Sequence, residues 1–332
     1  MDRIAFIVGD HFIYWNSIVL TLAAAVAIAF FLSLYIGKCG NAVAGFAAVP
    51  VAIVLSLVLA RLIHWYSRTD SYTSFGAAMM DFASGGYALM GVFAGCILTA
   101  VLLRLIFFHK NLPEMLDCMS IAGCAGIAVG RLAAFFNSAD RGQIIESMES
   151  LPWVYPVTNA VSGATEYRLA TFVIQAMVAF ALFACLSLFY IRGNRKEKLR
   201  DGDTALIFLL CYGASQVVLD STRYDSLFFR SNGFVSIVQV FSAIALAFAI
   251  VMFSVRMVKI RGFKFWQVPV WLLIAAGIGC AGFMEYYVQR HGNEAVFAYS
   301  VMSACLACVI ALTLLIRMIA VTAERKGSIS VG

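Results

Sequence analysis

Long apolar stretches follow one another along nearly the whole chain, and short polar segments separate them. Each stretch is about as long as the 17–25 residues that a helix needs to cross a bilayer. A soluble helix is apolar on one side only, so the pattern predicts membrane-spanning helices. Nine spans are predicted, at residues 13–36, 42–66, 85–108, 115–137, 168–191, 204–223, 234–255, 266–287 and 295–319.

Composition supports the same fold class, an all-α polytopic membrane protein. Hydrophobic residues make up 62% of the 332-residue chain and charged residues 13%, whereas soluble domains carry about 25% charged residues. These values exclude a soluble globular protein, a disordered chain and a nucleic-acid-binding module. The first apolar stretch is predicted to be a span, because its N-terminal flank lacks the basic region and cleavage site of a signal peptide.

The nine cysteines lie in apolar stretches or beside basic loops, and the loops predicted to lie outside contain none. A disulfide framework needs paired cysteines in an oxidising compartment, so none is expected. Cys305 and Cys308 have the spacing of a redox or metal pair, but they lie inside an apolar helix with no second pair. We assign them to helix packing, and the sequence contains no motif for a metal or a nucleotide cofactor.

Lysines and arginines are distributed unevenly between the two ends of the predicted spans. If the N-terminus is outside, the inner loops and span ends hold fifteen of the 24 Lys and Arg residues, including every lysine, and the outer ones hold seven. The positive-inside rule therefore predicts an outer N-terminus and a cytoplasmic C-terminus. The longest polar connection, residues 138–167, then faces outward, and its Trp153, Tyr155 and prolines predict a packed cap.

Two arginines lie within predicted spans, where ionisable residues are costly and mark candidate functional sites. Arg61 lies six residues before Ser67 and Arg131 lies seven before Ser138. At about 1.5 Å per residue, both are roughly 10 Å below the outer boundary. For Arg61 we favour snorkelling to the interface. For Arg131 we favour an anionic ligand, because the planar guanidinium matches a phosphate.

A polar stripe is predicted on the sixth span. Tyr212, Gln216, Asp220 and Arg223 are spaced by four, four and three residues. This spacing places them on one face of a helix. Asp220 can neutralise one arginine, and the positive charge that remains indicates an anionic ligand such as a phospholipid headgroup. Snorkelling is an equal alternative for Arg223.

Two pairs of glycines indicate where helices approach closely. Gly91 and Gly95, and likewise Gly126 and Gly130, have the spacing that lets helix backbones pack against each other. They predict that the third and fourth spans lie side by side, with Arg131 near the seam.

Three segments share a pattern of glycines, arginines and aromatic residues. Residues 130–142 read GRLAAFFNSADRG, residues 85–91 read GGYALMG, and residues 212–225 read YGASQVVLDSTRYD. In this order they resemble the motifs G-R-x-G-N-F-x-N-x-E-x-x-G, G-G-M-S-F-H-G and Y-G-x-x-R-x-x-x-E-x-x-R-x-P-D of the prolipoprotein diacylglyceryl transferase family. Alanines replace an asparagine and the glutamate of the first motif. Methionine replaces the histidine of the second, and glutamine and aspartate replace an arginine and the glutamate of the third.

The resemblance covers roughly residues 12–256, and it implies a seven-helix domain at 1–256 with an outer N-terminus. Residues 257–332 then add two transmembrane helices and a cytoplasmic tail. The family relation implies a bacterial plasma-membrane enzyme that moves diacylglyceryl from phosphatidylglycerol to the lipobox cysteine in the signal peptide of a preprolipoprotein. Such a transfer needs help to form the thiolate and cations to hold the departing phosphate, but no metal or nucleotide.

Carried over to this chain, the motifs imply a site at the outer ends of the spans. Arg131 is the first candidate to hold the phosphate, with Arg223 as a second clamp and Asp220 orienting one or both. The methionine of the second motif cannot accept a proton. If the reaction uses a histidine base, His64, three residues after Arg61 and on the same face, is the first candidate and His11 the second. An interfacial histidine without a chemical role is the alternative that we favour for His64. The remaining lipid-binding candidates are Tyr212, Gln216, Asn137 and Gly142.

Two other functions stay open at this point. The replaced histidine, arginine and asparagine of the motifs favour a non-catalytic relative that binds lipids or lipoproteins. A transporter would also carry polar residues in its spans, although it typically places them near the midplane on interrupted helices. The depth of Arg131 and its motif match predict that Arg131→Ala abolishes function, whereas Arg61→Ala preserves most of it.

Overall fold

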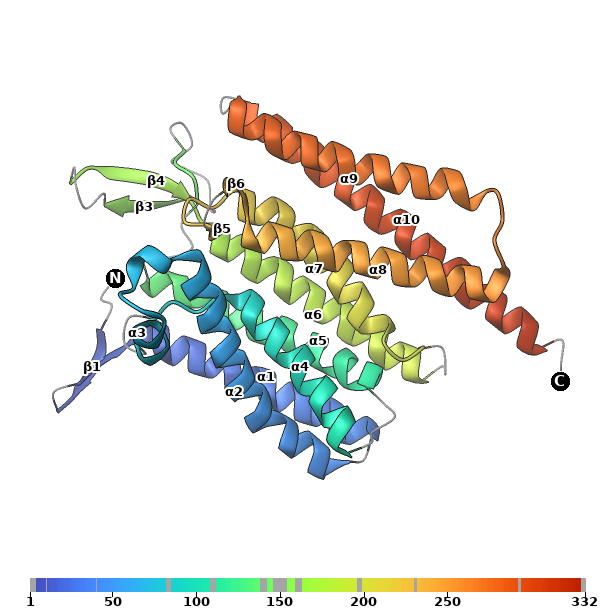
Figure 1. Cartoon of the computed structure of the whole chain (residues 1–332), viewed down its shortest axis with the longest axis horizontal. Coiled ribbons are helices and arrows are strands. Elements are labelled where there is room, and N and C mark those ends of the chain that lie inside the picture. The colour runs from blue at the N-terminus through green and yellow to red at the C-terminus, as the bar shows by residue number, and fades with distance from the viewer. Residues whose placement is uncertain are drawn as a thin grey trace. The chain divides into compact units, whose positions relative to one another are not determined.

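The computed structural model describes residues 4–9, 11–39, 41–81, 85–107, 112–137, 142–145, 154–158, 163–195, 199–229, 232–291 and 294–329. Its long helices (Figure 1) are α1 (Trp15–Cys39), α2 (Ala42–Ser67), α4 (Leu89–Phe107), α5 (Leu112–Arg131), α6 (Thr171–Arg195), α7 (Asp203–Ser221), α8 (Ile237–Arg261), α9 (Gln267–Arg290) and α10 (Ala295–Ile329). Within these residues, all nine are long and apolar enough to cross a membrane. The all-α polytopic membrane fold class is therefore confirmed.

The end of α7 differs from the predicted sixth span. The helix ends at Ser221, and the chain beyond it is extended, with Arg223 bridged to Gly142. The main-chain N–H of Gln143 donates to the Thr222 carbonyl oxygen (3.0 Å). Arg223 therefore does not continue the polar stripe on α7, and the prediction of one helix face was wrong. At residues 222–223, pairing with residues 142–143 takes the place of a further helical turn.

The chain divides into two compact units. The first comprises residues 1–208 and 222–238, and the second comprises residues 209–221 and 239–332. Helices α7 and α8 thus each contribute to both units. The division of the chain into domains at residue 256 stays a prediction.

The first unit contains two closely packed helix pairs, of which one is α2 with α4. Gly91 and Gly95 of α4 lie directly against α2, where any Cβ would overlap the main chain of Ala60 and Ser56. The Ser56 hydroxyl donates to the Val92 carbonyl oxygen (3.3 Å) at the same seam. Within a bilayer this close van der Waals contact, rather than the exclusion of water, holds helices together.

The second pair is α1 with α5. A Cβ at Gly126 would lie 2.9 Å from the Cβ of Ala27, and a Cβ at Gly130 would lie 3.4 Å from the Cβ of Ala23. The glycines of α4 therefore face α2 and those of α5 face α1. Helices α4 and α5 do contact each other, as predicted, but the prediction that these glycines join them was wrong. Spacing reveals that a helix has a flat side, but not which helix packs on it.

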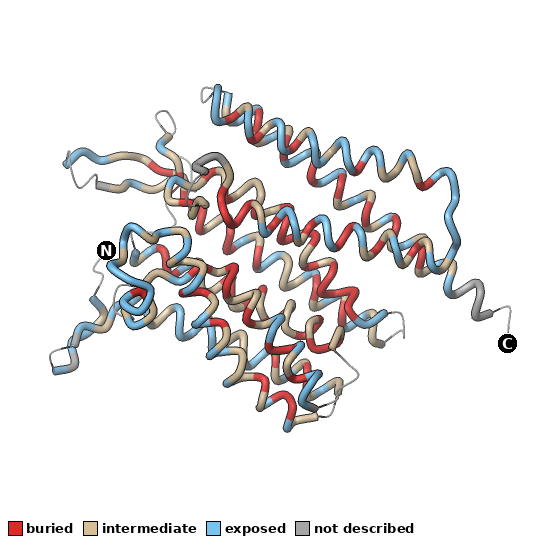
Figure 2. Tube along the Cα trace, in the orientation of Figure 1, coloured by how far each residue is buried: buried red, intermediate tan, exposed pale blue. Residues whose placement is uncertain are grey.

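Helix α5 is enclosed along most of its length (Figure 2), with buried residues from Glu114 to Ala128. Helices α1, α4 and α6 all contact it. Many of its buried side chains are the small ones of alanine and cysteine, which allow neighbouring helices to approach. The helix that ends at Arg131 is thereby held firmly within the first unit.

Short elements cover one end of the first unit (Figure 1). They are β1 (Ile4–Val8), β2 (His11–Tyr14), η1 (Thr69–Ser71), α3 (Phe75–Met80), η2 (Leu132–Phe136), β3 (Val154–Thr158), β4 (Thr165–Leu169), β5 (Phe228–Phe229) and β6 (Asn232–Ser236), where η denotes a 3₁₀ helix. The strands form three antiparallel hairpins. Residues 142–145 add to β4, because the Leu169 N–H donates to the Gln143 oxygen (3.1 Å). The described part of the predicted cap is thus a small sheet, while Trp153 lies outside the described residues.

The second unit joins the two C-terminal helices to α7 and α8. The Tyr299 hydroxyl of α10 donates to the Ser221 carbonyl oxygen at the end of α7 (3.1 Å). The Trp271 indole of α9 donates to the Ser254 hydroxyl of α8 (3.2 Å). Helices α9 and α10 pack along each other, so hydrogen bonds near both ends attach the pair to this unit.

Candidate functional site

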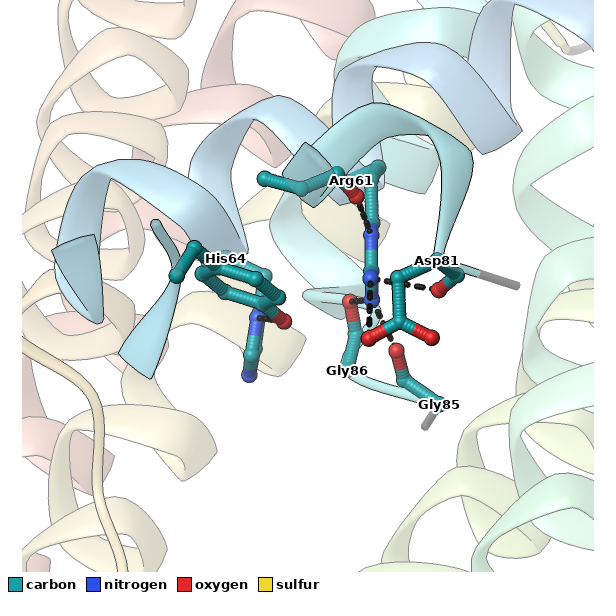
Figure 3. A network of polar contacts seen from close by, with 7 residues as sticks. Arg61, His64, Asp81, Gly85 and Gly86 are labelled. Atoms are coloured by element: carbon teal, nitrogen blue, oxygen red, sulfur yellow. Dashed lines mark hydrogen bonds and ion pairs between the residues drawn. The ribbon is translucent and has the colours of Figure 1, made fainter. Parts of the chain in front are cut away.

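Arg61 lies near the end of α2 and is buried, with 3% of its surface exposed. Its guanidinium donates to the carbonyl oxygens of Ala78 (2.6 Å), Asp81 (2.5 Å) and Gly86 (3.1 Å) and also to that of Gly85. It also lies 3.7 Å from the Asp81 carboxylate. Figure 3 shows the side chain enclosed by these groups. The prediction that Arg61 snorkels to the interface was therefore wrong.

The groups around Arg61 come from the connection between α2 and α4. The Ser74 hydroxyl caps α3 by accepting from the Ala77 N–H (3.1 Å). Gly85 and Gly86 then adopt φ values of 71° and 80°, which other residues seldom reach. The Ala88 N–H donates to the Ala60 carbonyl oxygen (3.1 Å) and returns the chain to α2. A capped turn and two glycines thus direct main-chain oxygens towards Arg61.

Two tyrosine rings flank the same guanidinium. Its central carbon lies 5.1 Å from the Tyr72 ring centroid and 5.5 Å from that of Tyr87, distances typical of cation–π contacts. An arginine has five N–H donors, and the protein oxygens around Arg61 occupy its three nitrogens. We call the group formed by Arg61, His64, Tyr72, Asp81, Gly85, Gly86 and Tyr87 the arginine cluster. Arg61 holds this cluster together through contacts with the protein itself.

His64 lies one helical turn beyond Ala60 and is half-buried. Its Nδ1 lies 3.2 Å from the Tyr72 hydroxyl. A Cβ at Gly86 would lie 2.6 Å from Cε1 of the imidazole, so the glycine main chain covers one side of the ring. The ring is thus fixed between Tyr72 and Gly86.

Met90 occupies the histidine position of the resembled motif and is buried, with 8% of its surface exposed. It lies in the first turn of α4, next to Gly91, which touches Ala60 of α2. His64 therefore lies at the same contact between α2 and α4 as Met90, but on α2. The sequence alone does not reveal this relation, because the motif and His64 are separated by the whole α3 connection.

Arg131 is the last residue of α5 and is half-buried. The chain continues into η2, where Phe136 stacks on Trp15 at 5.9 Å. Ala134, at the position of a motif asparagine, is buried in an apolar cluster with Ala170 and Phe172. An amide there would be buried among apolar side chains, so the replacement by alanine suits this fold. Asn137, at the end of η2, is exposed.

Gly142 and Arg223 meet in the small sheet of the cap. They form an antiparallel bridge, and a Cβ at Gly142 would lie 2.8 Å from the Thr171 hydroxyl oxygen. Close packing therefore explains why glycine is needed there. The Arg223 guanidinium forms an ion pair with Asp225 (3.2 Å) and is largely buried, with 11% of the side chain exposed.

Arg168 is a buried residue of this sheet that sequence reasoning missed. It forms an ion pair with Glu166 (2.8 Å), donates to the Gly142 carbonyl oxygen (3.3 Å) and lies over the Tyr224 ring (4.9 Å). It thus connects the Gly142 segment with the chain beside Arg223. The predicted boundaries placed Arg168 at the outer start of the span at 168–191 and not in the cap.

The predicted residues on α7 lie in the second unit. Tyr212, Gln216 and Asp220 are all buried, with at most 4% of their surface exposed. Gly213 packs against the Ser242 carbonyl oxygen of α8, which a Cβ would approach to 2.7 Å. Their roles in lipid binding stay predictions from the motif.

Comparison with known proteins identifies related sequences. Residues 3–255 match a family model described as prolipoprotein diacylglyceryl transferase, and the match ends within α8. Among similar proteins named phosphatidylglycerol–prolipoprotein diacylglyceryl transferase, that of Streptococcus sanguinis SK36 is 27% identical over 205 residues, which is 59% of this chain and 75% of the relative. That of Streptococcus pneumoniae JJA is 29% identical over 185 residues (54% and 67%). That of Streptococcus agalactiae A909 is 26% identical over 181 residues (54% and 67%).

Proposed function

The chain belongs to the prolipoprotein diacylglyceryl transferase family, and on this premise we propose that it transfers diacylglyceryl from phosphatidylglycerol to the lipobox cysteine of a preprolipoprotein. The observation that carries the proposal is the family match, which runs from before α1 into α8. The arginine cluster supports it, because it provides an ordered cationic group and a histidine at one end of the first unit.

The reaction exchanges a carbon–oxygen bond for a carbon–sulfur bond. The cysteine thiol loses its proton, the sulfur attacks the glyceryl carbon, and glycerol phosphate leaves with the electron pair of the broken bond. The protein must therefore supply a proton acceptor for the thiol and cations for the departing phosphate. Each requirement matches a different group of residues in the chain.

Arg131 is the proposed phosphate ligand. It is the last residue of an enclosed helix, and a guanidinium donates two parallel hydrogen bonds to a phosphate. Arg223 is the proposed second clamp, with Asn137 and Gly142 shaping the segment that leads to it. Arg61 is excluded from this role, because its guanidinium already binds four carbonyl oxygens.

His64 is the proposed proton acceptor. Met90 has no basic nitrogen, whereas His64 lies at the same joint of α2 and α4 and is half-buried. The positive charge of Arg61 nearby favours the thiolate that forms when the cysteine loses its proton. We therefore assign proton transfer to His64 on α2 rather than to position 90 on α4.

Purified protein, phosphatidylglycerol and a lipobox peptide test the proposal directly. We expect a thioether-linked diacylglyceryl peptide, detected by mass spectrometry, and its loss in Arg131→Ala. Arg104→Ala is the matched control. Arg104 is an exposed arginine in the last turn of α4, at the end of that helix opposite to Met90. Product formation by Arg131→Ala at the wild-type rate would contradict the phosphate assignment.

A non-catalytic relative that binds the lipid or the lipoprotein is the second candidate. The observations that favour it are the methionine, glutamine and alanine at positions 90, 216 and 134. A folded preparation that binds phosphatidylglycerol vesicles and the peptide, yet forms no thioether, would select this function. Complementation of a bacterial strain depleted of its own transferase would reject it.

The chain is a multi-pass membrane protein, and we propose that it lies in the bacterial plasma membrane with its N-terminus outside. The excess of lysine and arginine at one side of the spans supports this orientation. A fluorescent protein fused to the C-terminus should fluoresce, and alkaline phosphatase fused there should be inactive. The opposite pair of results would place the arginine cluster on the cytoplasmic side.

A further inference from the structure

We infer that Tyr72 is a positioning residue that binds the Nδ1–H of His64 and leaves Nε2 as the proton acceptor, and that Arg61 holds both contacts of His64 in place. The inference deepens the proposed transfer reaction and rests on it. Tyr72, His64 and Arg61 lie outside the three family motifs, whereas Gly86, the other contact of His64, belongs to the second.

The hydrogen bond between the rings sets the proton arrangement. The Tyr72 hydroxyl lies 3.2 Å from Nδ1 of His64, and no partner is found for Nε2 among the described residues. A neutral imidazole has one donor and one acceptor nitrogen, and a hydroxyl can accept one hydrogen bond while it donates another. If Tyr72 accepts from Nδ1–H, the lone pair of His64 lies on Nε2.

The imidazole has little freedom to turn. Gly86 covers one side so closely that a Cβ there would lie 2.6 Å from Cε1 and 2.8 Å from Nδ1. The Tyr72 ring meets the imidazole edge-on, at 6.1 Å and 79°. The two contacts are on residues of one connection, so the orientation of His64 depends on how that connection is held.

Arg61 holds both residues that touch His64. Its guanidinium donates to the Gly86 carbonyl oxygen (3.1 Å) and lies 5.1 Å from the Tyr72 ring centroid. One cation thereby positions the two contacts of the imidazole. This arrangement explains why a fully engaged arginine lies beside the proposed site.

The proton and electron balance of the step is simple. The thiol proton moves to Nε2, and the sulfur electron pair forms the carbon–sulfur bond. The electrons of the broken carbon–oxygen bond leave with glycerol phosphate. The imidazolium keeps its Nδ1–H on Tyr72 and later returns the Nε2 proton to solvent or to the released phosphate.

The proton arrangement can be measured without any activity. The chain has only four histidines, so ¹⁵N-histidine labelling and a His64→Asn reference identify the His64 signals. We expect ¹⁵N shifts of an Nδ1–H tautomer in the wild type and of a mixture in Tyr72→Phe. An Nε2–H tautomer in the wild type, or the same shifts in both proteins, would overturn the inference.

Transfer rates test the same role through chemistry. Tyr72→Phe keeps a ring over Arg61 and loses only the hydroxyl, so kcat should fall about 10-fold or more while the KM for phosphatidylglycerol is unchanged. Tyr66→Phe is the matched control on α2, because Tyr66 packs against Phe229 and not in the arginine cluster. Equal rates for Tyr72→Phe and the wild type would contradict the positioning role.

Two further variants exclude a merely structural effect. His64→Gly should lose about 100-fold or more of the rate, and added imidazoles should restore activity in proportion to their basicity. Gly86→Ala, whose Cβ displaces His64, should lose far more activity than Gly85→Ala, which has a similar φ but open space. Absent rescue, or equal losses at the two glycines, would overturn the inference.

The outcomes separate the inference from the function on which it rests. A wild type that forms no thioether but shows the Tyr72-dependent Nδ1–H tautomer refutes the transfer reaction and supports the positioning of His64. A wild type that forms product with an Nε2–H tautomer supports the transfer reaction and overturns the role of Tyr72.

Discussion

The first unit holds a cation at each end, and the two ends do so differently. Near the end of α2, four main-chain oxygens bind Arg61, and the Asp81 carboxylate lies 3.7 Å away. At the end of α1, Lys38 lies 3.0 Å from the Glu114 carboxylate and 3.6 Å from that of Asp201. The guanidinium is thus bound mainly by neutral groups, whereas the ammonium is bound by two acids.

This difference distinguishes the end at which we propose the reaction from the opposite end of the unit. Carbonyl oxygens satisfy the hydrogen bonds of Arg61 without cancelling its charge, and the one carboxylate near it, that of Asp81, is partly exposed and 3.7 Å away. At the lysine end, Asp117 of α5 accepts from the Gly202 (2.8 Å) and Ala205 (2.7 Å) N–H groups and caps α7. The acids there fix helix ends, and the proposed chemistry needs none of them.

The largest expected effect is that of Arg61→Ala. It leaves four main-chain carbonyl oxygens without their donor, which should cost about 1–3 kcal/mol for each one that stays buried and unsatisfied, and should abolish thioether formation. This reverses the expectation from sequence, since burial gives Arg61 a role that snorkelling would not. Thermal unfolding and product formation measure the effect, and Arg61→Lys should recover stability only in part. A stable, fully active Arg61→Ala protein would remove the distinction between the two ends.

Asp117→Ala should have a smaller effect of a different kind. Two N–H groups at the start of α7 lose their side-chain acceptor, so the free energy of unfolding should fall by about 1–3 kcal/mol. Activity per folded molecule should stay close to that of the wild type, because the lysine end takes no part in the proposed chemistry. Denaturation in detergent together with the thioether assay separates the two quantities. A loss of activity that exceeds the loss of folded protein would show that this end also serves function.

Met90→His should have the smallest effect in the wild-type protein, because His64 already supplies a base. In a His64→Ala background the same substitution should restore thioether formation, since both residues lie at the joint of α2 and α4. Met115→His, at a buried position near the start of α5, is the matched control and should restore nothing. Rescue by both substitutions, or by neither, would argue against the proposal that His64 of α2 serves in place of a histidine at position 90 of α4.

The predictions from sequence succeeded where the signal was local to one segment. Span positions follow from apolar length, and the motif at the end of α5 follows from residue order. They failed where the partner lies on another element. Gly91 packs on α2 rather than on α5, Arg61 is buried by the α3 connection, and Arg223 leaves the helix to pair with Gly142. A helical period contains no information about such contacts.

The sequence by itself determined a polytopic all-α membrane protein of the diacylglyceryl transferase family, because the cost of exposing polar main chain to lipid makes every long apolar stretch a helix. Only the tertiary structure decided that main-chain oxygens and tyrosine rings surround Arg61. Arg61 and Arg131 are alike in depth along their helices. Their surroundings differ, because folding surrounds Arg61 with carbonyl oxygens from a distant segment and places Arg131 where its enclosed helix ends.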